Sequence, residues 1–309
     1  MAKQVGSPHD RFVRRCLADI ELAKAFFRRF LTPEQIEDID IDSLQPGGKD
    51  SFVGEKLNAL TTDLLFSAPI QDHPGFLSLL VEHKSEGAAR GEGHILPFQM
   101  RSQEIMIMDY GRRNHPEKRY PLVRMLGLYH GERAYAGPHT VGEHIDAPKR
   151  MIPPRWKEAI ELIDLSAYSD QDLLGDGKLG VFLLVLKHIY ATDIVQTLEF
   201  LAPHMKKVEE ERGDDFIVTV FRYLYEAAKV ENHEPMIHIA VKTFSEETGG
   251  KMKTVAEFLR DEGKKETRLE IAKLMLADKQ PLEYIVKLTS LTMEQIKALS
   301  NQDGNLGSA

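Results

Sequence analysis

Two apolar runs separated by a turn-forming pentapeptide are the feature that most restricts how this chain can fold. The runs cover residues 64–70 and 76–81, and the segment between them reads QDHPG. Short apolar runs bounded by Gly and Pro favour strands, and their close spacing favours an antiparallel hairpin. We therefore predict that the two runs pair and that their outer ends lie side by side.

Three polar residues stand at those outer ends. Asp63 precedes the first run, and Glu82 and Lys84 follow the second. Glu82 and Lys84 share one face because alternate residues of a strand point the same way. Asp63 lies on the same face only if the hairpin loop has an even number of residues or the hairpin carries a bulge. A two-residue loop at 72–73 or 73–74 would meet the first condition.

Composition indicates an ordinary intracellular protein. The chain has 309 residues, of which 42% are hydrophobic and 28% charged, which is typical of globular domains. The single cysteine, Cys16, excludes an intrachain disulfide framework and suits a reducing cytosol. No apolar run approaches the roughly 20 residues that span a bilayer, and the N-terminus lacks the apolar core of a signal peptide. We expect a cytoplasmic protein that does not enter a membrane.

The net charge of −8 argues mildly against a general nucleic-acid binder, because affinity for the phosphate backbone comes from Lys and Arg. The distribution of charge weakens this objection. Residues 101–150 carry more basic than acidic side chains, whereas residues 151–250 hold a large acidic excess.

The order of predicted elements indicates an α/β fold. An amphipathic helix at 8–31 and a short helix at 33–39 precede the hairpin, and a helix at 95–113 and a buried strand at 120–129 follow it. This order predicts a mixed sheet with helices on its faces. Further helices are expected at 179–190, 194–208, 216–229, 235–244 and 255–278.

We expect a core at 1–150, a helical region at 151–262 and a helical tail at 263–309 that ends in disorder. The tail contains two short helical segments separated by residues 289–292, with Thr292 at a capping position. This outline fits a DNA-binding helix-turn-helix, and it equally fits a helical hairpin that packs or dimerises.

Asp63, Glu82 and Lys84 form a set that suits phosphodiester hydrolysis. Two carboxylates can hold Mg²⁺ or Mn²⁺ through oxygen ligands. The metal lowers the pKa of its bound water, and a lysine beside it stabilises charge that develops on the phosphate. Glu-X-Lys is common in charged chains, so from the pattern alone a catalytic site and solvated strand ends carry equal weight.

Several spaced motifs resemble a known family. The runs HDRFVRRCLADIELAKAFFRRFL, TTDLLF, LLVEHKS, LPFQM and PLVRMLGLYHGER occur in that order. Together they resemble the Rpn family of recombination-promoting nucleases, also described as YhgA-like transposases, in the PD-(D/E)XK nuclease superfamily. The resemblance covers about residues 8–145 and continues loosely in the tail.

This resemblance implies a restriction-endonuclease-like core, Mg²⁺-dependent DNA cleavage and a link to DNA recombination. It assigns Asp63 and Glu82 as metal ligands, Lys84 as the catalytic lysine and Gln99 as an auxiliary glutamine. The tyrosine that often stands four residues after this glutamine is replaced by Gln103. His83 and Glu55 match further family positions, for which a structural role is the more favoured interpretation.

Other interpretations remain open beside the nuclease. One is a catalytically silent DNA-binding or assembly protein retained from a mobile element, and another is a scaffold that uses its acidic helical half for protein contacts.

His9-Asp10 fits a helix start better than a metal site. Cleavage of both DNA strands would be natural for a homodimer. Candidate DNA contacts, which fit a solvated face equally well, are Arg101, Arg112, Arg113, Lys118, Arg119 and Arg124.

Overall fold

A computed structural model describes residues 7–47, 64–71, 73–82, 96–114, 119–175, 177–191, 193–228 and 232–303. The chain divides into two compact units, Met1–Phe244 and Ser245–Ala309. This division differs from the expected boundaries at 150 and 262, and each unit is described by itself. Within the described ranges, no helix combines the length and apolar character needed to cross a bilayer.

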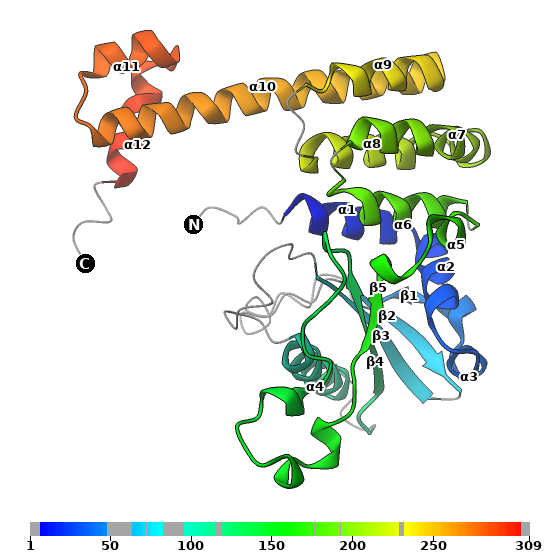
Figure 1. The fold of residues 1–309 in the computed structure, drawn as a ribbon. Helices are drawn as coiled ribbons and strands as arrows, with labels where there is room; N and C mark the ends of the chain where they lie inside the picture. Colours follow the sequence, from blue (N-terminus) through cyan, green and yellow to red (C-terminus); the bar gives the residue numbers. More distant parts are fainter. Residues whose placement is uncertain are drawn as a thin grey trace. The chain divides into compact units, whose positions relative to one another are not determined.

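The first unit is built on a five-stranded mixed sheet (Figure 1). Antiparallel pairing joins the first three strands, and parallel pairing joins the last three. The strands in spatial order are β1 (Gln45–Pro46), β2 (Leu64–Ile70), β3 (His73–Glu82), β4 (Leu122–Tyr129) and β5 (Glu161–Asp164). The predicted α/β class and mixed sheet are confirmed. β5 was not predicted, and it lies beyond residue 150, where only helices were expected.

The loop of the β2–β3 hairpin has an even number of residues. Leu64 pairs with Leu79, and the pairing continues to Ile70 and His73, so that positions 71 and 72 alone separate the paired ends. The loop is therefore one or two residues earlier than the loops considered from the sequence. Gln71 has a φ of 51°, the left-handed conformation that two-residue hairpin loops of type I′ require.

The N-terminal segment forms two helices, so the prediction of one helix at 8–31 was wrong. They are α1 (Pro8–Leu17) and α2 (Ile20–Phe30). The side chain of Asp19 accepts hydrogen bonds from the backbone N–H groups of Glu21 and Leu22, at 3.0 and 3.4 Å. An aspartate in this capping role starts a new helix. The short helix predicted next is confirmed as α3 (Pro33–Asp38).

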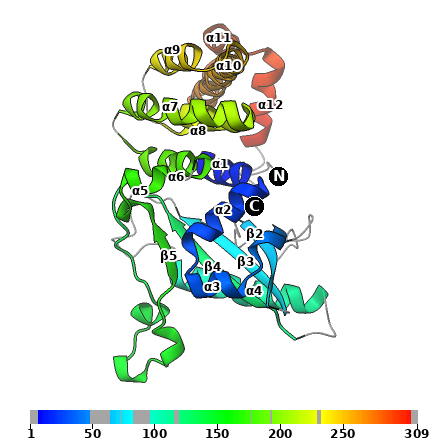
Figure 2. The ribbon, with the colours of Figure 1, turned by 90° about the vertical axis from the view of Figure 1, so that its right-hand side faces the viewer.

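Helices cover both faces of the sheet (Figure 2). On one face lies α4 (Leu96–Asn114), whose Met100 and Ile107 form a buried cluster with Leu80 of β3 and Val123 of β4. On the other face lies α2, where the rings of Phe27 and Phe66 are 5.5 Å apart. The sheet is thus a middle layer, and α4 packs on the face on which Leu80 lies.

The remaining helices of the first unit pack against α1 and α2 and against one another. Residues from Leu179 to Leu186 are buried on every side, which makes α6 a core helix. The helices are α5 (Asp170–Leu174), α6 (Lys178–His188), α7 (Ile194–Arg212), α8 (Asp215–Ala227) and α9 (Glu234–Thr243). Single 3₁₀ turns occur at Ile41–Ser43, Val141–His144, Lys149–Met151, Pro154–Trp156 and Leu165–Ala167.

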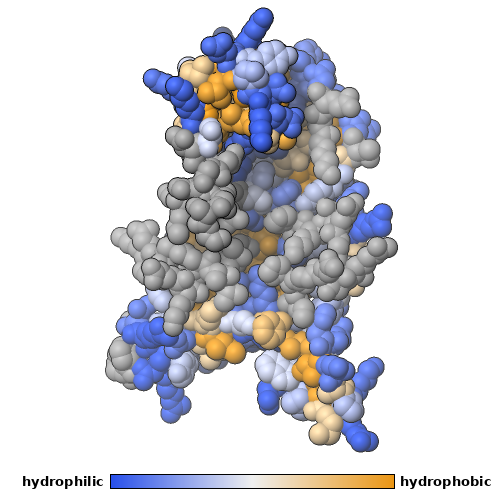
Figure 3. All heavy atoms as spheres, turned by 90° about the vertical axis from the view of Figure 1, so that its left-hand side faces the viewer, coloured by the Kyte–Doolittle hydropathy of each residue, from blue (hydrophilic) through white to orange (hydrophobic). Residues whose placement is uncertain are grey.

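The second unit contains a long helix and two short ones: α10 (Glu246–Ala277), α11 (Leu282–Thr289) and α12 (Met293–Asp303). Its core contains Ala272, Ile285 and Ile296. Thr292 Oγ1 accepts a hydrogen bond from Gln295 N at 3.2 Å, which confirms the predicted cap between the two short helices. Figure 3 shows hydrophobic side chains framed by hydrophilic ones on this unit. Leu274 and Leu288 are exposed hydrophobic residues of the same unit.

Candidate active site

Glu82 ends β3 on the face that α4 covers. Side chains of a strand alternate between its two faces, so Glu82 shares a face with Ser78 and Leu80, both of which are buried, and Leu80 packs against α4. Glu82 itself is half-buried. The strand therefore carries a carboxylate from an apolar interior to the edge of the sheet.

The ends of two further strands stand beside Glu82. Glu82 pairs in register with Tyr129 of β4, and Tyr129 pairs with Asp164 of β5. Because β3, β4 and β5 are parallel, all three residues lie at the carboxyl edge of the sheet, where α/β proteins bind ligands. By strand alternation they also share the α4 face. Two carboxylates and a phenol thus form one row.

Asp164 is held firmly at this edge. Its Oδ2 accepts a hydrogen bond from Tyr135 N at 2.8 Å, and its Oδ1 accepts one from Ser166 N at 2.9 Å. Two backbone N–H groups therefore share the carboxylate charge. Asp164 fixes the loop that follows β4 across the end of the sheet.

Phenol groups near Glu82 remain protonated at neutral pH. Burial raises the pKa of Tyr129, and the charges of Asp164 and Glu82 add to this effect. Burial, followed by the charge of Glu82, raises the pKa of Tyr135 to about 12. The pKa of Tyr190 also rises to about 12, through burial and the neighbouring Tyr129, Glu132 and Glu82. These phenols are hydrogen-bond donors at the carboxyl edge.

The four site residues expected from the sequence divide into two pairs. Glu82 and Gln99 belong to the described chain, and Gln99 lies half-buried near the start of α4. Asp63 and Lys84 lie outside the described residues, as do Glu55 and His83. Among the residues that the structure describes, no three His, Cys, Asp or Glu side chains form a metal-binding group.

His9 lies near the same end of the sheet. Its Nδ1 is 2.7 Å from the hydroxyl of Tyr223, and its ring centroid is 5.3 Å from that of His130. His130 follows β4 directly, and its backbone N–H donates to Glu82 O at 3.2 Å. Asp10 has the helix-start role predicted for it, since its Oδ2 accepts a hydrogen bond from Ser7 N at 3.3 Å.

Comparison with known proteins identifies the family. The sequence profile described as "Putative transposase, YhgA-like" matches residues 7–214, which include the whole sheet. The chain belongs to the YhgA-like family. This confirms the resemblance drawn from the ordered motifs.

Relatives that match most of this YhgA-like chain carry nuclease names. Recombination-promoting nuclease RpnA of Escherichia coli K12 is 26% identical over 302 residues, which cover 96% of this chain and 99% of RpnA. RpnD of E. coli O157:H7 is 25% identical over 229 residues, covering 71% of this chain and 81% of RpnD. The inactive nuclease-like protein RpnE of E. coli K12 is 25% identical over 303 residues, covering 93% and 95%. No solved structure matches the chain.

The basic residues considered for DNA contact do not form one cluster in this family member. Arg101 and Arg112 are 11 positions apart on α4, which separates them by about 16 Å. Arg101 pairs with Glu104 at 3.0 Å, Arg113 with Asp109, and Arg124 with Glu161 at 3.5 Å. Lys118 lies outside the described residues. Arg119 remains as an exposed residue beside the hairpin loop.

Asp164 and Tyr129 were missed as neighbours of Glu82. Tyr129 was recognised as the end of a strand, but its partner across the sheet depends on which strands are parallel. Asp164 ends a strand of four residues that follows a proline-rich stretch, too short to give a clear alternation. The usable signal was the sequence ELIDLS, an apolar pair followed by an aspartate and a serine.

Proposed function

We propose that this protein is a metal-dependent endonuclease that hydrolyses phosphodiester bonds of DNA during recombination, with a core of the PD-(D/E)XK type. The observation that carries the proposal is the position of Glu82. It ends a strand at the carboxyl edge of a mixed sheet, beside Tyr129 and Asp164. The nuclease names of relatives that match most of the chain support the same activity.

The hairpin register supports Asp63 as the partner of Glu82. The proposal needs both carboxylates on one face of the hairpin. An even loop is the condition that permits this, and the pairing is even from Ile70–His73 through to Leu64–Leu79. An odd loop would have contradicted the proposal.

The donor set fits a hard divalent cation in part. Glu82 offers carboxylate oxygen, the ligand type that Mg²⁺ and Mn²⁺ prefer, and Asp63 would supply the second carboxylate. Asp164 is engaged by two backbone N–H groups, so we assign it to positioning. When bound, the metal would lower the pKa of its water and neutralise charge on the phosphate.

The chain's own groups would then orient and stabilise the reacting phosphate. We assign Lys84 to the charge that develops on the phosphate oxygens, because an ammonium group at that point stabilises it electrostatically. Gln99 would orient the scissile strand as an amide donor. The protonated Tyr129 and Tyr135 would keep the Glu82 edge polar without adding a negative charge that repels DNA.

A plasmid-cleavage assay tests the proposal. We expect wild-type protein to cut DNA with Mg²⁺ or Mn²⁺ and to leave it intact in EDTA. Asp63→Ala and Lys84→Ala should each lower the cleavage rate by at least about 100-fold, the scale of losing one electrostatic contact to the transition state. Both variants should retain the circular dichroism spectrum and the DNA affinity of wild type. If wild type leaves plasmid and single-stranded DNA uncut while these variants bind DNA normally, the catalytic proposal fails.

A catalytically silent DNA-binding or assembly factor is the second candidate. The name of RpnE, an inactive nuclease-like relative that matches over nearly its whole length, favours it. This candidate predicts DNA binding that falls steeply with salt and is unaffected by Mg²⁺. Lys84 argues for the nuclease, since the resemblance assigns it as the catalytic lysine.

A further inference from the structure

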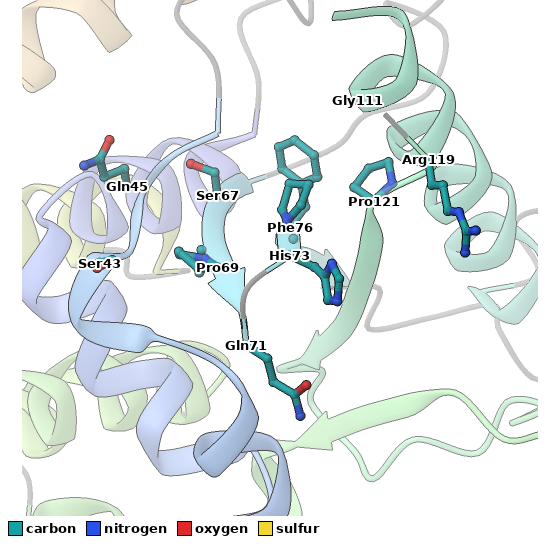
Figure 4. Close-up of a pocket in the computed structure, with 13 residues that line it drawn as sticks. Ser43, Gln45, Ser67, Pro69, Gln71, His73, Phe76, Gly111, Arg119 and Pro121 are labelled. Carbon is teal, nitrogen blue, oxygen red and sulfur yellow. The ribbon is translucent and has the colours of Figure 1, made fainter. Parts of the chain in front are cut away.

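A groove crosses the sheet at the end opposite to Glu82 (Figure 4). Its volume is about 650 Å³, which lies in the range of small-molecule sites. Across its width lie, in this spatial order, Ser67, Phe76 and Pro121, with Gln45 on one side and Arg119 on the other. The groove therefore has an apolar middle and polar margins.

The groove is separate from the candidate active site. Phe76 and Glu82 are six positions apart on β3, which corresponds to about 20 Å. Between them, Ser78 and Leu80 are buried, with exposed fractions of 0% and 1%, and Leu80 packs against α4. The α4 helix thus separates the two sites on the same face of one strand.

Arg119 gives the groove its charge. In the part of the chain that the structure describes, Arg119 has no ion pair, whereas Arg113 pairs with Asp109 and Arg124 with Glu161. Among described residues, no carboxylate lines this groove. Asp38 and Arg119 both line an adjoining cavity, but no ion pair joins these two described residues, and Asp38 Oδ1 accepts a hydrogen bond from Gln71 Nε2 at 2.9 Å. The arrangement favours an anion, because a guanidinium without a carboxylate partner is free to bind phosphate.

Phe76 gives the groove a fixed aromatic surface. It is half-buried, and Gly111 of α4 lies against its ring. A Cβ added at Gly111 would stand 3.0 Å from Phe76 Cε2 and 2.5 Å from Pro121 Cγ. The absence of a side chain at position 111 therefore lets the helix hold both rings in place. Aromatic rings presented in this way stack on nucleobases regardless of sequence.

We propose that this groove binds an unpaired nucleotide, with its phosphate at Arg119 and its base against Phe76. The amide of Gln45 and the hydroxyl of Ser67 contact base edges from the margin. The inference rests on the proposed function, from which it takes DNA as the substrate. It adds a second contact with DNA, remote from the cleavage centre. The same chemistry suits a free nucleotide, so the experiment compares the two sources.

Binding is measured in EDTA by fluorescence anisotropy with a labelled 12-nucleotide single strand. Arg119→Ala should weaken binding roughly tenfold at low salt and reduce the salt slope by about one, as expected for one lost phosphate contact. Arg212→Ala is the matched control, because it removes the same charge from an exposed side chain at the end of α7 that lies outside the groove. Its affinity should stay within about twofold. Equal losses in the two variants would overturn the inference.

The stacking contact is tested with a strand whose bases are all replaced by abasic sites. Base removal should weaken wild-type binding, and Phe76→Leu should weaken binding of the normal strand about 5- to 150-fold, the measured range for one stacked base. Phe76→Leu should bind the abasic strand as well as wild type does. That unchanged binding shows that the loss is not a folding defect, and Phe76→Tyr, which keeps the ring, should retain the wild-type affinity for the normal strand. Equal losses for normal and abasic strands would contradict stacking.

Competition with a nucleoside monophosphate distinguishes a free nucleotide from a nucleotide within a strand as the ligand of the groove. Displacement of the single strand at micromolar concentration assigns the groove to a free nucleotide, and failure to displace it assigns the groove to a nucleotide within a strand. Because no metal is present, these results do not depend on cleavage. If the protein cuts DNA but its binding does not depend on Arg119 or Phe76, only the groove proposal is overturned. If the variants bind as predicted but the protein never cuts DNA, only the nuclease proposal is overturned.

Discussion

At the scale of single residues, the pKa values of the tyrosines around Glu82 depend on where its carboxylate lies. Tyr135 has a pKa of about 12 because it is buried and because the negative charge of Glu82 opposes ionisation. The same carboxylate contributes to the raised pKa values of Tyr129 and Tyr190. These effects need the Glu82 charge to be close to all three rings.

Glu82→Gln should therefore lower the pKa of Tyr135 from about 12, since a neighbouring negative charge favours the neutral phenol and its removal favours the phenolate. The titration of ¹³C-labelled tyrosine, followed by NMR, measures the change. Asp146→Asn serves as a control, because Asp146 is an exposed acid in the loop after β4. If Glu82→Gln leaves the titration unchanged, Glu82 does not face this edge.

Sequence reasoning identified Glu82 because it ends an apolar run in a recognisable motif. It did not identify Asp164 or Tyr129 as neighbours, because their proximity arises from the parallel register of three strands. Pairing between distant strands leaves no local periodicity to read. The sequence could thus indicate one member of the row at the carboxyl edge, and the tertiary fold supplied the other two.

At the scale of elements, Asp19 divides the N-terminal segment into two helices. Its side chain caps α2 and also forms an ion pair with Lys178 of α6. Burial alone would raise the pKa of Asp19, but the hydrogen bond and charge of Lys178 and the two backbone N–H groups lower it overall. The apolar spacing of residues 8–31 continues across this break, so periodicity alone predicted one helix.

Asp19→Ala should lower the free energy of unfolding by about 1 kcal/mol through loss of the cap. Asp19→Asn keeps a capping oxygen and removes only the charge. Because the folded pKa of Asp19 lies below its ordinary value of 3.8, its charge stabilises the fold above about pH 4 and this stabilisation is lost as the pH falls through the folded pKa. Urea unfolding of wild type and Asp19→Asn at pH 7 and pH 3 measures this. A difference that persists unchanged at pH 3 would contradict the assignment.

The sequence predicted most elements well where their pattern was long. The strands β2 and β3, the helix α4 and the capped helices of the tail all occur where expected. Short elements were missed, because β1 and β5 contain two and four residues. Elements of this length are stabilised by pairing with their neighbours rather than by their own sequence.

At the scale of the whole molecule, the proposed catalytic machinery lies within one compact unit. The sheet and the row of Glu82, Tyr129 and Asp164 belong to Met1–Phe244, whereas α10, α11 and α12 form a unit with its own small core. The family profile ends at residue 214, also within the first unit. The activity should therefore reside in residues 1–244.

A chain that ends at Phe244 should fold and cut DNA at a rate within about threefold of the full chain, because the removed part contributes no residue to the proposed site. A cooperative thermal transition followed by circular dichroism checks folding, and plasmid cleavage checks activity. A fragment that folds cooperatively but has lost cleavage would show that the second unit contributes to catalysis.

The most direct test of the account is the cleavage rate of Glu82→Gln under single-turnover conditions with saturating Mg²⁺. The substitution keeps the size of the side chain and removes a carboxylate that we assign to the metal. The exposed Glu257→Gln on α10 is the matched control. We predict a loss of at least about 1,000-fold for Glu82→Gln, on the scale of losing a group that stabilises the transition state, with the control within about twofold of wild type. Cleavage by Glu82→Gln at the wild-type rate, with the same need for Mg²⁺, would contradict the account.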